Sequence, residues 1–303
     1  MRPLILGAAA AVALHACAPD AARNDTLAVS DFVSERITIV TRGEGPDIIL
    51  VPGLASHRNV WAGVADSLDD RYRLHLVQVN GFAGLDPADN ADGPVSAPVA
   101  EELARYIDET ALEQPAVIGH SMGGSIAMML AARHPESVGR VMVVDMFPYL
   151  GTVFAPGATA EEMRQQADTF RAQILADSAG SPTGVLEQMF AGMTRIDSMK
   201  PMLMEGLRGT DRQTAANAMH ELFLVDLRPE LANITAPMSV LYAPPQDASV
   251  PDEQLDRAVR ESFANVPHAR IVRVDDSAHF IFFDQPGQFV AEVDTLMRAT
   301  RTE

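Results

Sequence analysis

The sequence predicts an α/β fold, with a mostly parallel, doubly wound sheet and a helical insertion. Short apolar runs of strand type recur along the chain, with helical patterns between several of them, which indicates a parallel sheet covered on both faces. One long stretch, from about 149 to 227, contains no good strand candidate. With 303 residues, 47% of them hydrophobic, the chain can form one large core, or a core with a small accessory domain.

The strand candidates begin with residues 36–41, where polar and apolar side chains alternate as in a half-buried strand. Residues 47–51 form an apolar run that ends at Pro52 and Gly53, which is typical of a central parallel strand buried on both faces. Similar apolar runs lie at 74–79, 116–118, 141–144, 239–242 and 271–274. Helical patterns follow two of the strand candidates, at 99–110 and 125–134.

The stretch without strand candidates is interpreted as a helical insertion between two strands of the sheet. Thr159 and Glu162 have the spacing of a capping box, which opens a helix that continues towards Ala179. Thr210 begins another helix that runs to about residue 226. We therefore expect a helical cap over about 149–227.

The N-terminal segment has the pattern of a secretory signal peptide over residues 1–16. Arg2 supplies a short positive region, and residues 3–16 form an apolar stretch too short to span a bilayer as a mature helix. The stretch leads directly to Cys17, the only cysteine of the chain. Small residues before a lone cysteine resemble a bacterial lipoprotein signal, in which the thiol is lipidated and the chain is cut just before it. We expect a lipidated Cys17 and a tether over residues 17–34, followed by one α/β domain over 35–303.

Two other outcomes for this segment stay open. His15 departs from the lipoprotein pattern, and an ordinary signal peptidase could cut at the small residues around Cys17, or the segment could remain as an uncleaved anchor. Ala18 and Pro19 follow the cysteine, without the aspartate that often retains lipoproteins at the inner membrane. The expected location is therefore outside the cytoplasm, in the periplasm or at the outer membrane, with the lipid as the membrane contact.

Charge and cysteine content exclude several classes of partner. The net charge is -18 and Lys200 is the only lysine, so no basic run could neutralise a nucleic-acid backbone. Removal of residues 1–16 would leave Cys17 as the sole cysteine, and its lipidation would leave no disulfide and no cysteine-bound metal. We expect no cofactor and no metal.

Residues 119–123, Gly-His-Ser-Met-Gly, match the pattern G-x-S-x-G. An apolar strand candidate precedes the motif, and a helix start rich in small residues follows it. A strained strand-to-helix turn would lift the Ser121 oxygen clear of the backbone, and the glycines remove side chains that would clash. The helix N-terminus would direct its free N–H groups at the site. Ser121 is therefore the candidate nucleophile, and the alternative is a structural Gly-Ser turn.

With this motif the chain resembles the α/β-hydrolase family, over about residues 35–303. The resemblance rests on three motifs: Gly-His-Ser-Met-Gly-Gly at 119–124, Val-Pro-Gly-Leu at 51–54 followed by Trp61, and Ala-His-Phe at 278–280 followed by Asp-Gln-Pro at 284–286. It implies the serine hydrolase or esterase branch, with the chain order Ser, acid, His. Asn80 stands where many members have an aspartate, which is usually structural.

The resemblance also implies a general base and an acid for Ser121. His279 lies beyond the last strand candidate, where the fold would bring it back over the serine. Asp247 follows the strand candidate at 239–242 by a short loop, which matches the usual acid position of the family. Asp145, at the end of the preceding strand candidate, is the alternative that some members use. The acid orients the imidazole and stabilises its protonated form.

The oxyanion hole should use main-chain N–H groups. The expected donors are Met122 and either Leu54 or Ala55, whereas Pro52 has no N–H to donate.

A serine nucleophile with a histidine base performs acyl transfer, which argues against the dehalogenases and epoxide hydrolases of the family, because these use an aspartate nucleophile. The cap holds methionines and phenylalanines that pack its helices or line an adaptable apolar acyl pocket: Met163, Met189, Met193, Met199, Met202, Met204, Met219, Phe170, Phe190 and Phe223. We expect a small-molecule ester with an apolar acyl or aryl part as substrate. The alternatives are lactone opening, cleavage of carbon–carbon bonds and peracid formation on the same triad, or a lipid-anchored binding protein without catalysis.

Overall fold

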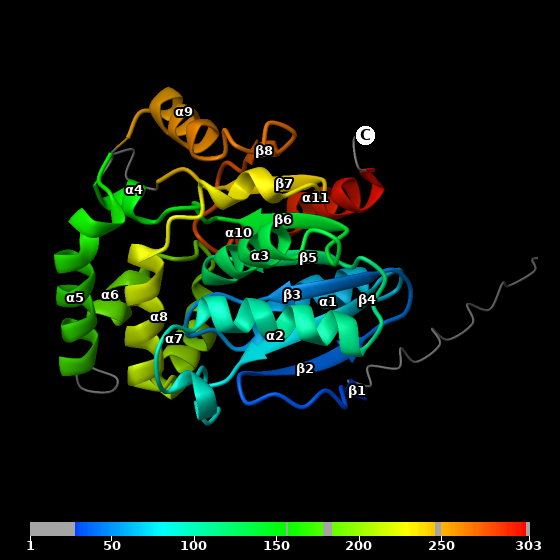
Figure 1. Ribbon diagram of the computed structural model, residues 1–303, viewed down its shortest axis with the longest axis horizontal. Coiled ribbons are helices and arrows are strands. Elements are labelled where there is room, and N and C mark those ends of the chain that lie inside the picture. The colour runs from blue at the N-terminus through cyan, green and yellow to red at the C-terminus, as the bar shows by residue number, and fades with distance from the viewer. Residues whose placement is uncertain (1–27, 156, 178–183, 246–249, 301–303) are drawn as a thin grey trace, which may run out of the picture.

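The computed structural model describes residues 28–155, 157–177, 184–245 and 250–300 (Figure 1). The expected signal peptide, Cys17 and most of the expected tether lie outside these residues. Within the described ranges, no helix combines the length and the apolar character needed to cross a bilayer.

One eight-stranded sheet forms the centre of the described chain, in the order β1-β2-β4-β3-β5-β6-β7-β8. All neighbouring pairs from β4 to β8 are parallel, whereas β1 and β2 are antiparallel to their neighbours. The strands are β1 Ala28–Val29, β2 Ile37–Arg42, β3 Asp47–Val51, β4 Arg73–Val79, β5 Ala116–His120, β6 Arg140–Val144, β7 Met238–Tyr242 and β8 Arg270–Arg273. The predicted fold class, a mostly parallel α/β sheet, is confirmed.

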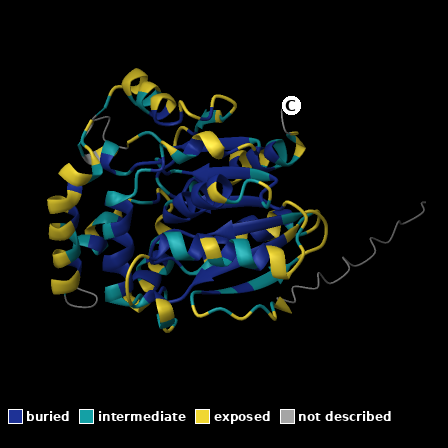
Figure 2. Ribbon diagram, viewed as in Figure 1, coloured by how far each residue is buried: buried dark blue, intermediate teal, exposed yellow. Residues whose placement is uncertain are grey.

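Helices cover both faces of this sheet. In Figure 1, α2 and α3 lie on the near face, and α1 and α11 lie on the far face, where they contact each other. The helices outside the insertion are α1 Ala62–Leu68, α2 Ser96–Glu109, α3 Met122–Arg133, α9 Asp252–Ser262, α10 Ile281–Asp284 and α11 Pro286–Arg298. Short 3-10 turns are η1 Arg58–Trp61, η2 Ala88–Asn90, η3 Asp197–Met199 and η4 Glu230–Asn233. The apolar strands are buried between these layers, as the dark blue of Figure 2 shows.

The chain between β6 and β7 forms helices and, in its described part, no strand. These helices are α4 Gly151–Phe154, α5 Ala160–Ala176, α6 Val185–Ala191, α7 Lys200–Gly209 and α8 Arg212–Leu224. The capping box at the start of α5 is present, because the Thr159 side chain accepts from Glu162 N and the Glu162 carboxylate accepts from Thr159 N. We call α4 to α8, with the loops between them, the cap.

A carboxylate of the cap closes the N-terminus of a helix in the core. Glu221 of α8 is buried, and its oxygens accept the main-chain N–H groups of Val95, Ser96 and Ala97 at 2.8, 2.6 and 2.9 Å. The first N–H groups of a helix have no acceptor within it and carry partial positive charge, so a carboxylate there is stabilising. This contact attaches α8 to the start of α2.

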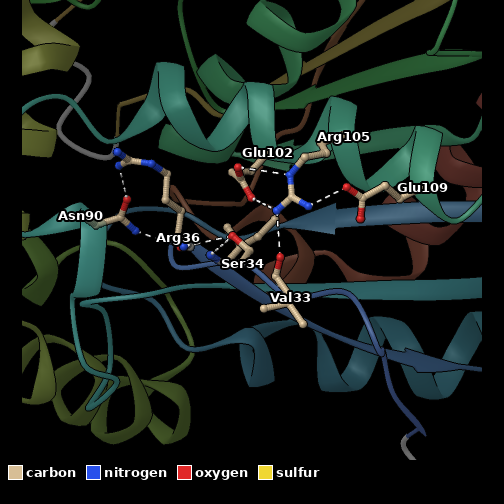
Figure 3. Close-up of polar contacts among 8 residues, drawn as sticks. Val33, Ser34, Arg36, Asn90, Glu102, Arg105 and Glu109 are labelled. Carbon is tan, nitrogen blue, oxygen red and sulfur yellow. Dashed lines mark hydrogen bonds and ion pairs between the residues drawn. The ribbon is translucent and has the colours of Figure 1, made fainter.

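The segment before β2 is attached to the outer side of α2. Arg105 donates to the main-chain oxygen of Val33 at 2.8 Å and pairs with Glu102 and Glu109 on its own helix (Figure 3). Its guanidinium also lies 4.2 Å from the centre of the Phe32 ring, which is a cation–π distance. The domain therefore remains structured for several residues before its first long strand.

Candidate active site

Ser121 lies at a strained turn between β5 and α3. Its backbone has φ 52° and ψ -123°, a combination that costs a non-glycine residue about 1–3 kcal/mol. Ser121 N donates to Val144 O at 2.9 Å, and Ser121 O accepts from Gly124 N at 2.7 Å. The surrounding bonds hold the turn and present the serine at the start of the helix, as the sequence motif predicts.

The geometry of this turn explains the two glycines of the motif. A Cβ at Gly119 would lie 1.9 Å from Gly123 O, and a Cβ at Gly123 would lie 2.2 Å from Val51 O. Both contacts are with main-chain atoms, one in α3 and one in β3, which cannot move aside as the end of a flexible side chain could. Only glycine lets β5, α3 and the end of β3 approach this closely.

His279 lies in the loop between β8 and α10, and its ring is held by Asp145. The Nδ1 atom of His279 is 2.6 Å from Oδ2 of Asp145, which follows β6. The other carboxylate oxygen, Oδ1, accepts from Ala243 N at 2.9 Å. Ser121, Asp145 and His279 all line one cavity, so nucleophile, base and acid candidates share a single site.

Among the described residues, the carboxylate on Nδ1 of His279 is Asp145, which the sequence offers as the alternative acid. Asp247, the acid that the family resemblance implies, lies outside the described ranges. Asp145, the alternative, occupies the position on Nδ1. The strand β6 is the neighbour of β5 in the sheet, and the left-handed backbone of Asp145, with φ 51°, turns the chain directly after β6.

His120 also contacts His279, the candidate base, a contact that the sequence does not predict. Its Nε2 donates to the main-chain oxygen of His279 at 2.9 Å, and its ring packs 4.4 Å from that of Phe280. Burial, with the nearby His279 adding to it, holds the pKa of His120 well below its usual value, so the ring is neutral and Nε2 carries its proton. The sequence shows a histidine directly before Ser121, but it does not indicate the partner of that histidine, which lies 159 residues away along the chain.

The expected oxyanion donors lie next to Ser121. Met122 is the first residue of α3, so its N–H has no acceptor within the helix. On the other side, Gly53 O accepts from Ser56 N, which makes Leu54 and Ala55 the central residues of a turn. This turn passes close to Ser121, because a Cβ at Gly53 would lie 3.1 Å from Ser121 Cβ. The geometry supports a pair of donors from these two segments.

The cavity beside these residues has a volume of about 230 Å³ and is mostly apolar. Its apolar lining comes from the segment after β6, from the cap and from the base loop: Met146, Phe147, Leu150, Val153, Phe170, Met189, Phe190, Met193, Met219, Leu222 and Phe280. None of the described lining residues is a lysine or an arginine. Of the cap residues that sequence analysis named, Met163 and Phe223 are instead buried in helix packing.

The family model described as "alpha/beta hydrolase fold" matches residues 46–286. The chain therefore belongs to the α/β-hydrolase family, and it is an enzyme of that family. Its curated relatives include pimeloyl-[acyl-carrier protein] methyl ester esterases. The one from Nitrosomonas europaea is 27% identical over 86% of this chain and 99% of that protein. The one from Aeromonas hydrophila is 28% identical over 85% and 98%, respectively.

Solved structures show the same fold. The enol-lactonase from Burkholderia xenovorans LB400 has a TM-score of 0.70 at 19% identity and covers 87% of this chain and 96% of its own. The esterase EaEST from Exiguobacterium antarcticum has a TM-score of 0.72 at 17% identity, with the same coverage of 87% and 96%. At these identities the likeness concerns the fold alone.

Proposed function

We propose that the protein is a serine hydrolase that cleaves carboxylic esters with a small apolar acyl or aryl part, through Ser121, His279 and Asp145. The observation that carries this proposal is the 2.6 Å contact of Asp145 with His279 in the cavity that a strained serine also lines. The proposal takes Asp145 and not Asp247 as the acid, because Asp145 contacts Nδ1 of His279.

The proposed reaction has two halves. Ser121 Oγ attacks the ester carbonyl while His279 takes its proton, and Asp145 stabilises the imidazolium that forms. The N–H groups of Met122 and the Leu54–Ala55 turn bind the oxyanion. The alcohol leaves with the proton from His279, and the acyl group stays on Ser121. Water then attacks this acyl-enzyme, again giving its proton to His279, which returns it to Ser121 as the acid leaves.

The volume and the lining of the cavity favour an uncharged acyl group of moderate size. A cavity of about 150 Å³ holds one benzene ring, so by simple proportion about 230 Å³ holds roughly nine non-hydrogen atoms. A carboxylate buried there would find no lysine or arginine among the described lining residues. The names of the curated relatives specify a methyl ester, which agrees with an ester as the bond to be cleaved.

The proposal is tested with a fluorophosphonate probe and a panel of p-nitrophenyl esters, lactones and diketones. We expect labelling at Ser121 and fastest hydrolysis of esters with acyl chains of about six to nine carbons. Ser121→Ala should lower kcat by about 10⁵-fold or more and abolish labelling. Ser125→Ala, in the same helix, is the control and should stay active. Preference for lactones or diketones would replace the ester assignment, and a folded wild type that neither reacts with the probe nor hydrolyses any substrate would favour a binding protein.

We also propose that Cys17 is lipidated and that the enzyme is exported, anchored by the lipid at the outer membrane or held in the periplasm. The support is the apolar leader that ends at a lone cysteine. Mass spectrometry of the mature N-terminus tests this proposal. A diacylated Cys17 at the first position supports it, whereas an N-terminus without added lipid contradicts it.

A further inference from the structure

Asp284 joins two segments that are distant in sequence. It ends α10, five positions after His279, and both of its carboxylate oxygens are in use. Oδ2 accepts from Ala278 N at 2.7 Å, directly before the base. Oδ1 accepts from the Thr194 hydroxyl at 2.7 Å and from Arg195 N at 2.9 Å, in the loop between α6 and η3 of the cap.

A second contact joins the same two segments on the other side of the base. Phe280 N donates to Met193 O at 2.9 Å. The cap loop at residues 193–195 is thus bonded to the base loop both before and after His279. Thr194 is only 2% exposed, and hydrogen bonds donated to a carboxylate in such a place are stronger than exposed ones, because little water competes for them.

The cap loop also forms part of the acyl cavity. Met193 lines the cavity beside Ser121 and His279, and the next residue, Thr194, is bonded to Asp284. A displacement of this loop would therefore change the acyl wall and the base loop together.

We propose that Asp284 is a positioning residue, which holds His279 and the Met193 wall of the acyl cavity in one fixed relation. This inference rests on the proposed ester hydrolysis and extends it, because it connects recognition of the acyl chain with proton transfer at the base. Asp284 acts through its hydrogen bonds and does not touch the reacting atoms.

An asparagine at this position cannot reproduce the contacts. The carboxylate accepts main-chain N–H groups on both oxygens, from Ala278 and from Arg195. The amide of asparagine has one oxygen and one NH₂ group, so one of these N–H groups would face another donor. Because a displacement of about 1 Å can cost about 10²-fold in rate, Asp284→Asn should lower kcat by about 10- to 100-fold.

Two further variants separate the contributions. Thr194→Val removes the hydroxyl donor on the cap side and leaves Ala278 bonded, so it should raise KM for an octanoate ester at least threefold with little change in kcat for an acetate ester. Asp276→Asn is the matched control. Its side chain is 84% exposed in the same base loop, it faces Arg195 at 4.0 Å, and its φ of 54° suits asparagine. This control should keep kcat and KM within twofold of the wild type.

The experiment measures kcat and KM of the full chain with p-nitrophenyl acetate and p-nitrophenyl octanoate, together with the thermal midpoint. We expect Asp284→Asn to have a lower kcat on both esters. Its KM should rise more for octanoate than for acetate. A folded Asp284→Asn that matches Asp276→Asn in both parameters would overturn the inference.

If Asp284→Asn does not fold, the Thr194→Val result decides. A rise in KM confined to octanoate supports the inference, and equal changes on both esters or no change contradict it. A wild type without ester hydrolysis and without probe labelling would contradict the proposed function itself. That outcome is distinct, because it appears before any variant is compared.

Discussion

The ring of His120 donates a hydrogen bond to the main-chain oxygen of His279 at 2.9 Å, so the residue before Ser121 holds the loop that contains His279. The segments of Ser121 and His279 are thereby fixed relative to one another by a contact that involves neither the serine hydroxyl nor the His279 ring. His120→Phe keeps an aromatic ring but removes the donor, and should lower kcat by about 10- to 100-fold.

His120→Gln is the matched variant for this contact, because its amide retains an N–H donor of similar reach. It should retain more kcat than His120→Phe when both are assayed with the same p-nitrophenyl ester. Equal losses in the two variants, with both folded by circular dichroism, would assign the effect to packing of the ring instead.

The acid of the triad is tested by comparing two asparagine variants. Asp145→Asn should lower kcat by about 10⁴-fold, because the amide favours the wrong tautomer of His279. Asp247→Asn should have a much milder effect, since the bond to Nδ1 is made by Asp145. Steady-state kinetics of both variants decides the matter, and the opposite ranking would restore the acid that sequence analysis preferred.

The glycines of the chain give a pair of stability predictions with opposite signs. Gly123→Ala places a Cβ 2.2 Å from Val51 O and should lower the free energy of unfolding by about 3 kcal/mol or more. Gly63→Ala, on the exposed side of α1, adds a Cβ that would meet no atom outside its own helix within 4 Å, and it should raise the free energy of unfolding by about 0.5–1 kcal/mol. Urea unfolding of both variants provides the measurement, and a neutral Gly123→Ala would refute the account of the turn.

The buried neutral His120 makes stability depend on pH. Its pKa is held well below the usual value by burial, so below about pH 6.5 the unfolded chain binds a proton that the folded chain does not. Stability contributed by the neutral ring is present above about pH 6.5 and is lost as the pH falls below it. The free energy of unfolding, measured from pH 8 to pH 5, should therefore fall less steeply for His120→Gln than for the wild type.

The sheet and the serine turn were predictable because their signals are local. The apolar run at β3 indicates a buried strand, and the glycines around Ser121 indicate that main-chain segments approach closely there. The carboxylate partner of His279 is harder to predict, since Asp145 and Asp247 both follow strands and the choice depends on how a loop folds in three dimensions. The contacts of His120 and Asp284 were beyond sequence reasoning, because each joins residues from different elements.

The contact of Glu221 with the start of α2 limits how the substrate range could be re-engineered. Because α8 supplies the buried Glu221 carboxylate that pairs with the first N–H groups of α2, α8 is structurally a part of the core, although it belongs to the cap by sequence. A chimera that exchanges the entire insertion for that of a relative would leave the first N–H groups of α2 unpaired unless the donor carries an equivalent carboxylate. The segment for transplantation is therefore α4 to α7, with the junction placed before α8 and with residues 193–195 kept, because these residues are bonded to the loop of His279.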